Sequence, residues 1–186
     1  VGVITNIGPA HLEFFGDEFG VLKEKWSLIE ELSGPRIAIL NADDSLLKER
    51  LLADTDGAIF SFGIKNKADV MAKKIIQAGN RVTFYIKNYP IELNTISKIN
   101  VYNALCAYTA ARIFSVDAYD IIKKFREFQF PDSRLQIKMI KGLRVIDDAY
   151  NANPASFLCA IDALSSLPAG GRKIVVIADM LELGEM

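Results

Sequence analysis

Short β-branched runs alternate with helix-like segments along most of this 186-residue chain. The strand-like runs, which turn residues flank, are 1–5, 36–40, 58–62, 135–140, 143–146 and 173–177. The helix-like runs between them are 18–32, 45–53, 101–113, 119–125 and 155–167. Strands that alternate with helices predict an α/β fold, in which helices cover a mostly parallel sheet.

Residues 70–96 interrupt this alternation, because they contain strand-like runs with no helix between them. Residues 78–80, Ala-Gly-Asn, predict one hairpin turn, and residues 88–90, Asn-Tyr-Pro, predict a second. We therefore expect an antiparallel β flap attached to the α/β core.

A second change of organisation lies in the segment FQFPDSRLQ, where Pro131, Asp132 and Ser133 separate a helix from a new strand. We expect two folded units, 1–132 and 133–186, with a hinge near 131–134. The first residues already read as a strand, so we expect the chain to be a fragment of a longer protein.

Composition excludes several classes of partner. The formal net charge is −1 and no long basic run is present, so nothing attracts the chain to nucleic acid or to an anionic membrane. No apolar stretch approaches the roughly 20 residues of a membrane span. Cys106 and Cys159 are isolated within helix-like patterns, which is typical of a reduced, cytoplasmic protein rather than of a disulfide framework.

The only histidine, His11, follows the first strand, at the edge where open α/β sheets bind ligands. Taken alone, His11 is better interpreted as an imidazole that a backbone carbonyl satisfies. Lys25, taken alone, is a solvated helix residue. A protonated lysine has no lone pair for a metal, so Lys25 could bind one only if it were modified to a carbamate.

Two further polar groups leave both a structural and a functional interpretation open. The sequence Asn-Ala-Asp-Asp at 41–44 follows a strand, and a helix cap is its stronger interpretation. Asn100 and Asn103 are spaced i, i+3 and therefore share a helix face. They could cap the helix or recognise the edge of a base.

The segment RVIDDAYNANPAS gives the strongest functional signal. Asp147 and Asp148 are adjacent like charges, which are unfavourable unless something neutralises them, and Asn151 and Asn153 follow before a helix. A ribose, or a metal with phosphates, would fit, and the helix N-terminus can receive an anion. Arg134 suits planar contact with phosphate.

In order, the segments TNIGPAHLE, NVYNAL, DSRLQ, DDAYNANPAS and DMLELGE, together with Lys25, resemble those of the Mur ligases. The resemblance is greatest to the D-alanyl-D-alanine-adding branch. It implies the second half of the central ATPase domain at 1–132, followed by the start of a Rossmann-like C-terminal domain at 133–186. The phosphate-binding Gly-rich loop and the UDP-sugar domain would then lie upstream.

The resemblance also implies an activity: ATP-dependent addition of D-alanyl-D-alanine to UDP-N-acetylmuramoyl-tripeptide, through an acyl phosphate, in cytoplasmic peptidoglycan synthesis. It implies Mg²⁺ as a cofactor. Another Mur-superfamily amide ligase, or a scaffold that is inactive on its own, is the alternative. The implied roles are magnesium binding by His11 and carbamoylated Lys25, adenine contact by Asn100 and Asn103, phosphate and ribose contact by Arg134 and Asp148, and a substrate-side position for Asn151 and Asn153.

Overall fold

The computed structural model describes residues 1–9, 12–52 and 57–180. One sheet contains six strands in the order of the chain. Strands β1 to β4 pair in parallel and β4 to β6 pair antiparallel. Their bounds are β1 Gly2–Ile4, β2 Ile37–Asn41, β3 Ala58–Gly63, β4 Val70–Ala78, β5 Arg81–Ile86 and β6 Tyr89–Leu93.

The predicted α/β class and the predicted antiparallel strands are therefore confirmed, with one refinement. The flap continues the main sheet, because Phe62 and Gly63 of β3 pair with Val70 and Met71 of β4. The second hairpin turn also lies slightly earlier than predicted. Pro90 belongs to β6, which is an edge strand and so tolerates a residue without an N–H donor.

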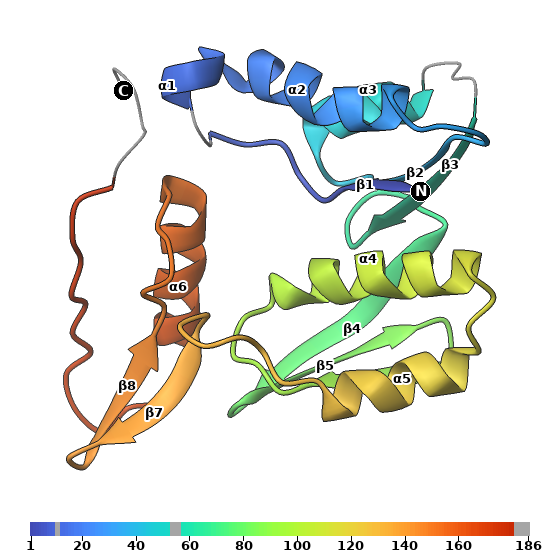
Figure 1. Cartoon of the computed structure of the whole chain (residues 1–186). Coiled ribbons are helices and arrows are strands. Elements are labelled where there is room, and N and C mark those ends of the chain that lie inside the picture. Colours follow the sequence, from blue (N-terminus) through green and yellow to red (C-terminus); the bar gives the residue numbers. More distant parts are fainter. Residues whose placement is uncertain (10–11, 53–56, 181–186) are drawn as a thin grey trace.

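Helices cover both faces of the parallel part of the sheet (Figure 1). α2 and α3 pack on one face, and α4 packs on the other, while α5 packs beside β6. The bounds are α1 Leu12–Phe15, α2 Glu18–Glu30, α3 Ser45–Leu52, α4 Asn100–Ile113 and α5 Ala118–Glu127. Within the described ranges, no helix has both the length and the apolar character needed to cross a membrane.

Alternation along β2 explains how two cores form on one strand. Ala38 and Leu40 contribute to the core with Trp26 of α2, whereas Ile39 contributes to the core with Val101 of α4. Successive strand residues point to opposite faces, so a strand buried on both sides is apolar throughout. The uninterrupted apolar run Ile-Ala-Ile-Leu in β2 is therefore explained by burial on both faces of the strand.

Residues after the linker form a second, smaller unit with its own two-stranded sheet. β7 Gln136–Ile140 pairs antiparallel with β8 Leu143–Asp147, and α6 Pro154–Ser166 follows. Leu135, Ile137 and Ile146 pack against a small buried cluster of Ile96, Ala163 and Leu167. Because Ile96 belongs to the first unit, this cluster joins the two units through apolar contact.

The strand predicted at 173–177 is wrong. These residues have no regular secondary structure, and Val176 is 93% exposed. A β-branched run becomes a strand only where a neighbouring strand supplies its hydrogen bonds. The segment instead runs as an extended trace outside the β7–β8 pair (Figure 1).

Substitutions on the two faces of the antiparallel strands should differ in their effect on the free energy of unfolding. Phe84 of β5 is fully buried, whereas Ile76 of β4 is 59% exposed on the opposite face. We expect Phe84→Ala to lower the free energy of unfolding by about 3–5 kcal/mol, because it removes core contacts and leaves a cavity. Ile76→Ala should change it by less than about 0.5 kcal/mol.

Urea denaturation followed by circular dichroism measures both variants against the unmodified chain. Equal losses for Phe84→Ala and Ile76→Ala would contradict the assignment of the two faces.

Candidate functional site

The turn at 41–44 shapes the carboxyl edge of the parallel sheet. The Asn41 amide donates to the carbonyl oxygen of Thr5 at 3.0 Å, and the Asp44 carboxylate accepts from the Ile7 amide at 2.6 Å. These two contacts hold the loop that follows β1. Asp44 also accepts from the amides of Leu46 and Leu47, which confirms the helix-cap interpretation for this residue.

Asp43 joins two other elements to the same turn. Its carboxylate accepts hydrogen bonds from the backbone amides of Ile64, Lys65 and Asn66 at 2.6 to 3.2 Å, and from the Tyr102 hydroxyl at 2.9 Å. Burial disfavours the charged carboxylate, but these donors outweigh it and hold the pKa of Asp43 below its ordinary value. Burial, then the hydrogen bond to Asp43 and finally the Asp43 charge raise the pKa of Tyr102.

Sequence reasoning did not find the contact between Asp43 and Tyr102. The two residues are 59 positions apart, and the Tyr side chain lies in an ordinary helical pattern. The only available signal was the second acid of the Asn-Ala-Asp-Asp sequence, since one aspartate is enough to cap a helix.

Lys25 lies on α2, which begins at an N-cap, Asp17, whose side chain accepts from the Gly20 amide. The Lys25 ammonium donates to the carbonyl oxygen of Asn6 at 3.0 Å. Lys25 therefore contacts the loop that leads toward His11. His11 itself lies outside the described residues. Within the ranges that the structure describes, no three His, Cys, Asp or Glu side chains gather into a metal site.

Asn100 and Asn103 do share one face, as their spacing predicts. The Asn103 amide donates to the Asn100 side-chain oxygen at 3.0 Å, and the Asn100 amide donates to the Thr95 hydroxyl at 2.8 Å. The N-cap position of α4 is Ile99, which makes no side-chain cap contact, so neither asparagine caps this helix. Asn103 is exposed, so a ligand can reach this face of the helix.

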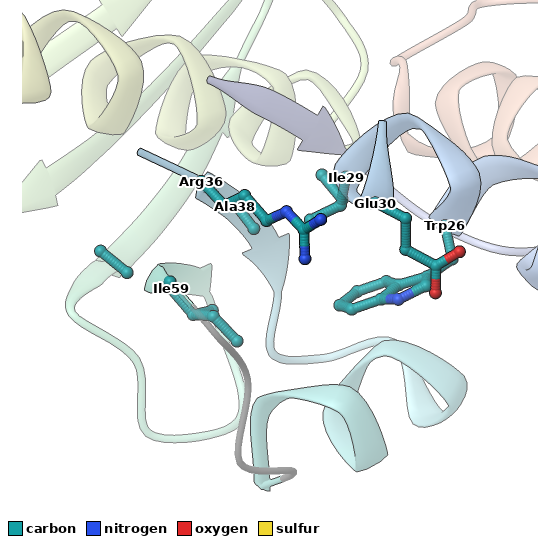
Figure 2. Close-up of a pocket in the computed structure, with 8 residues that line it drawn as sticks. Trp26, Ile29, Glu30, Arg36, Ala38 and Ile59 are labelled. Atoms are coloured by element: carbon teal, nitrogen blue, oxygen red, sulfur yellow. The ribbon is translucent and has the colours of Figure 1, made fainter. Parts of the chain in front are cut away.

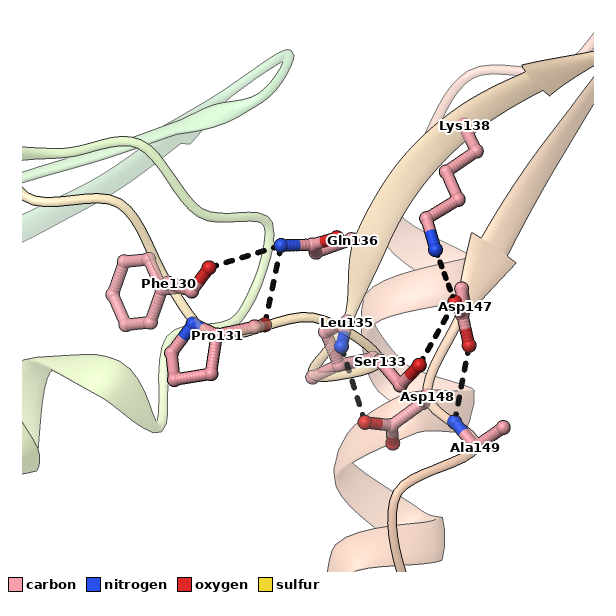
Figure 3. A network of polar contacts seen from close by, with 9 residues as sticks. All are labelled: Phe130, Pro131, Ser133, Leu135, Gln136, Lys138, Asp147, Asp148 and Ala149. Carbon is pink, nitrogen blue, oxygen red and sulfur yellow. Dashed lines mark hydrogen bonds and ion pairs between the residues drawn. The ribbon is translucent and has the colours of Figure 1, made fainter.

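The adjacent acids Asp147 and Asp148 are satisfied within the second unit (Figure 3). Asp147 accepts from the Lys138 ammonium, the Ser133 hydroxyl and the Ala149 amide, and the contact with Lys138 lowers the pKa of Asp147. Asp148 accepts from the Leu135 amide at 3.1 Å, and burial raises the pKa of Asp148. Lys138 therefore neutralises Asp147 across the hairpin without a ligand, whereas Asp148 has a backbone amide as its partner.

The two later asparagines have local contacts. Asn153 is the N-cap of α6 and forms a reciprocal capping box with Ser156, while Pro154 occupies the first turn. The Asn151 side-chain oxygen accepts from the Ala152 amide at 2.9 Å, and Asn151 is exposed. Asn153 thus has a structural role that its place in the motif did not reveal.

A hollow of about 470 Å³ lies where the two units meet, and Arg134 and Thr95 both line it. Thr95 is the residue that accepts from Asn100, but neither Asn100 nor Asn103 itself lines this hollow. The Arg134 guanidinium carbon lies 3.9 Å from the centre of the Tyr150 ring. Lys25 does not line this hollow.

A separate cavity of about 180 Å³ lies between α2 and the amino ends of β2 and β3 (Figure 2). Trp26, Ile29 and Ile59 provide apolar walls, and Glu30 and Arg36 stand at its edge. It lies at the opposite end of the strands from the turn at 41–44, so it is not part of the candidate site.

The Asp43 contacts predict a pH-dependent stabilisation. Since the folded pKa of Asp43 is depressed, its contribution is fully present above the unfolded value of 3.8 and is lost as the pH falls through the folded value. We expect Tyr102→Phe to lower the free energy of unfolding by about 1–2 kcal/mol at pH 7, because a hydrogen bond to a charged group is lost. The difference in the free energy of unfolding between Tyr102→Phe and the unmodified chain should become smaller below about pH 4.

Tyr108→Phe is the matched control, because Tyr108 is buried on the same helix and its hydroxyl makes no hydrogen bond to the described residues. Urea denaturation at pH 7 and pH 3 measures both variants. A difference for Tyr102→Phe that stays constant across this range would show that the Asp43 charge is not the partner.

Two family models match this chain. The Mur ligase middle domain matches residues 1–111, and the Mur ligase glutamate ligase domain matches residues 133–186. The chain is 32% identical to the UDP-N-acetylmuramoyl-tripeptide--D-alanyl-D-alanine ligase of Bacillus subtilis, over 99% of this chain and 40% of that protein. It therefore spans about two fifths of the length of the curated relatives it matches.

Solved structures give the same result. MurF from Acinetobacter baumannii is 30% identical with a TM-score of 0.90, over 98% of this chain and 40% of that chain. MurF ligase from Thermotoga maritima, in complex with ADP, is 26% identical with a TM-score of 0.84, over 99% of this chain and 43% of that chain. The resemblance predicted from the motifs is confirmed: the chain belongs to the Mur ligase family.

Proposed function

We propose that this chain acts within a longer ATP-dependent ligase that joins D-alanyl-D-alanine to UDP-N-acetylmuramoyl-tripeptide in the cytoplasm, during peptidoglycan precursor synthesis. The observation that carries the proposal is that ligases with this named activity match 98–99% of the chain, through both units. In this proposal residues 1–132 belong to the central ATP-binding domain and residues 133–186 begin the C-terminal domain.

The proposed chemistry has two steps. A carboxylate oxygen of the tripeptide attacks the γ-phosphorus of ATP, and ADP leaves, which gives an acyl phosphate. The amine of D-alanyl-D-alanine then attacks the acyl carbon, inorganic phosphate leaves, and the nitrogen loses a proton to give the amide. Such transfers depend on positioning and on neutralisation of the phosphoryl charge.

We assign the nucleotide to the junction of the two units. Asn100 and Asn103 supply amide groups for the adenine, Arg134 supplies a guanidinium for phosphate, and Asp148 supplies a carboxylate oxygen for the ribose. The hollow bordered by Arg134 and Thr95 supports this assignment, because it brings residues of both units to one space. Asn151 and Asn153 are assigned to the substrate side, where Asn153 acts mainly by fixing the start of α6.

We assign His11 and Lys25 to magnesium. The contact between Lys25 and Asn6 supports this, because it brings the lysine side chain from α2 against the loop that leads to His11. As an ammonium Lys25 is only a donor, whereas a carbamate on the same nitrogen would supply the oxygen ligands that Mg²⁺ requires. When bound, the magnesium ion would neutralise phosphoryl oxygens.

Ligation by the complete protein tests the proposal. Purified protein is incubated with UDP-N-acetylmuramoyl-tripeptide, ATP and magnesium, and with one amine at a time: D-alanyl-D-alanine, L-alanine or D-glutamate. We expect product and phosphate in equal amounts with D-alanyl-D-alanine. Faster reaction with a single amino acid would identify another Mur-type ligase, and no reaction with any amine would favour the scaffold alternative.

The 186-residue chain by itself should not turn over ATP. Its sequence contains no Gly-rich phosphate loop ending in Gly-Lys-Ser or Gly-Lys-Thr, whose amides and lysine hold the β- and γ-phosphates. Phosphate release measured with a coupled colorimetric assay should equal that of buffer. Repeated turnover that copurifies with the chain through two chromatographic steps would refute this prediction.

Lys25→Ala in the complete protein should reduce the rate of ligation by about 10²-fold or more, the range seen when one charge-stabilising group is removed. The fold should persist, because alanine is a good helix former. Lys23→Ala is the control, since Lys23 is exposed on the same helix. The assignment fails if Lys25→Ala and Lys23→Ala both retain nearly full activity with unchanged melting temperatures.

A further inference from the structure

We propose that Tyr150 is a positioning residue, which holds the face of the Arg134 guanidinium so that its N–H edge is presented to phosphate oxygens. That this phosphate belongs to a nucleotide rests on the proposed function. The positioning itself rests on three features of the structure: an unusual backbone around Arg134, contacts that fix this backbone, and the stacking geometry.

The backbone on both sides of Arg134 is left-handed. Ser133 has a φ of 56° and Leu135 has a φ of 51°. Residues other than glycine rarely adopt this region, and they persist there only when the surrounding structure determines the conformation. Two such residues flank Arg134, so the course of the backbone on both sides of the arginine is set by its surroundings.

Three contacts from 147–150 hold this turn in place, and Figure 3 shows the two that Asp147 and Asp148 make. The Ser133 hydroxyl donates to Asp147, and the Leu135 amide donates to Asp148. The Tyr150 amide donates to the Ser133 carbonyl oxygen at 3.2 Å. The backbone that carries Tyr150 is therefore bound to the turn that carries Arg134, and the two side chains meet as a consequence.

The meeting of these side chains leaves the donors of Arg134 available. The guanidinium carbon lies 3.9 Å from the ring centre, well inside the range of a cation–π contact. A ring contact uses the face of the guanidinium, whereas its N–H groups lie in the plane. Among the described residues, no acceptor takes a hydrogen bond from this guanidinium and no carboxylate lies within ion-pair distance of it.

The surroundings of Arg134 favour an anion. Arg81 lines the same hollow, but Arg81 is paired with Glu92 at 3.0 Å. Among the described residues that line this space, Arg134 thus supplies the guanidinium without an ion pair, and the nearest charge that acts with it is that of Asp148. A ring that restricts its rotamers reduces the entropy lost when an anion binds.

Three forms of the 186-residue chain test the proposal: unmodified, Tyr150→Phe and Tyr150→Leu. Tyr150 is 67% exposed, so neither substitution threatens the core. NMR follows the Arg134 side-chain N–H resonance, first alone and then during titration with ADP and with inorganic pyrophosphate. Tyr119→Leu is the control, because Tyr119 is 72% exposed on α5.

We expect the unmodified chain and Tyr150→Phe to share a ring-current shift of Arg134 and to bind both probes with dissociation constants within about twofold of each other. Tyr150→Leu should lose the shift and bind about fivefold more weakly, which corresponds to an exposed cation–π contact. Tyr119→Leu should match the unmodified chain.

The proposal is overturned if Tyr150→Leu binds as well as the unmodified chain, if Tyr150→Phe is weakened as much as Tyr150→Leu, or if the unmodified chain binds neither probe. These outcomes are distinct from failure of the proposed function. A complete protein that ligates no amine would refute the ligase, while pyrophosphate binding that depends on the Tyr150 ring would still support the positioning role.

Discussion

The arrangement of the first unit depends on the hydrogen bonds that the Asp43 carboxylate accepts. β3 and β4 pair in parallel through only two residues each, and six residues, 64–69, connect them. Parallel strands normally need a much longer crossover. The short connection is possible because the amides of Ile64, Lys65 and Asn66 bond to Asp43 instead of to a strand. Without this acceptor, three backbone donors would lack a partner where β4 joins the sheet.

The same turn relates the two parts of the proposed active site. Asp43 also binds Tyr102, and so fixes the first turn of α4 that carries Asn100 and Asn103. Asn41 and Asp44 fix the loop after β1, whose Asn6 carbonyl accepts from Lys25. A four-residue turn therefore positions α4, which carries the proposed nucleotide contacts, and the loop after β1, which carries the proposed metal ligand, relative to one strand. This explains how residues far apart in the chain share one edge of the sheet.

Local patterns were sufficient to predict most elements of the fold. The helices, the parallel strands and the hairpins of residues 70–96 follow from periodicity and turn residues, which are properties of neighbouring positions. The strand expected at 173–177 was wrong, because the pattern specifies an apolar strand but not the neighbour that must pair with it. α1 was missed, because four residues are too few to show a helical period.

Long-range partners could not be predicted in the same way. Lys138 neutralises Asp147 across a hairpin, and Tyr102 contacts Asp43 from 59 residues away. Neither contact leaves a periodic signal in the sequence.

A map of ADP binding on the ¹⁵N-labelled chain tests most directly the proposal that both units contribute to one nucleotide site. We expect saturable shifts at the side chains of Asn100, Asn103 and Arg134 together. Shifts confined to one unit, or to the cavity beside Trp26, would contradict it.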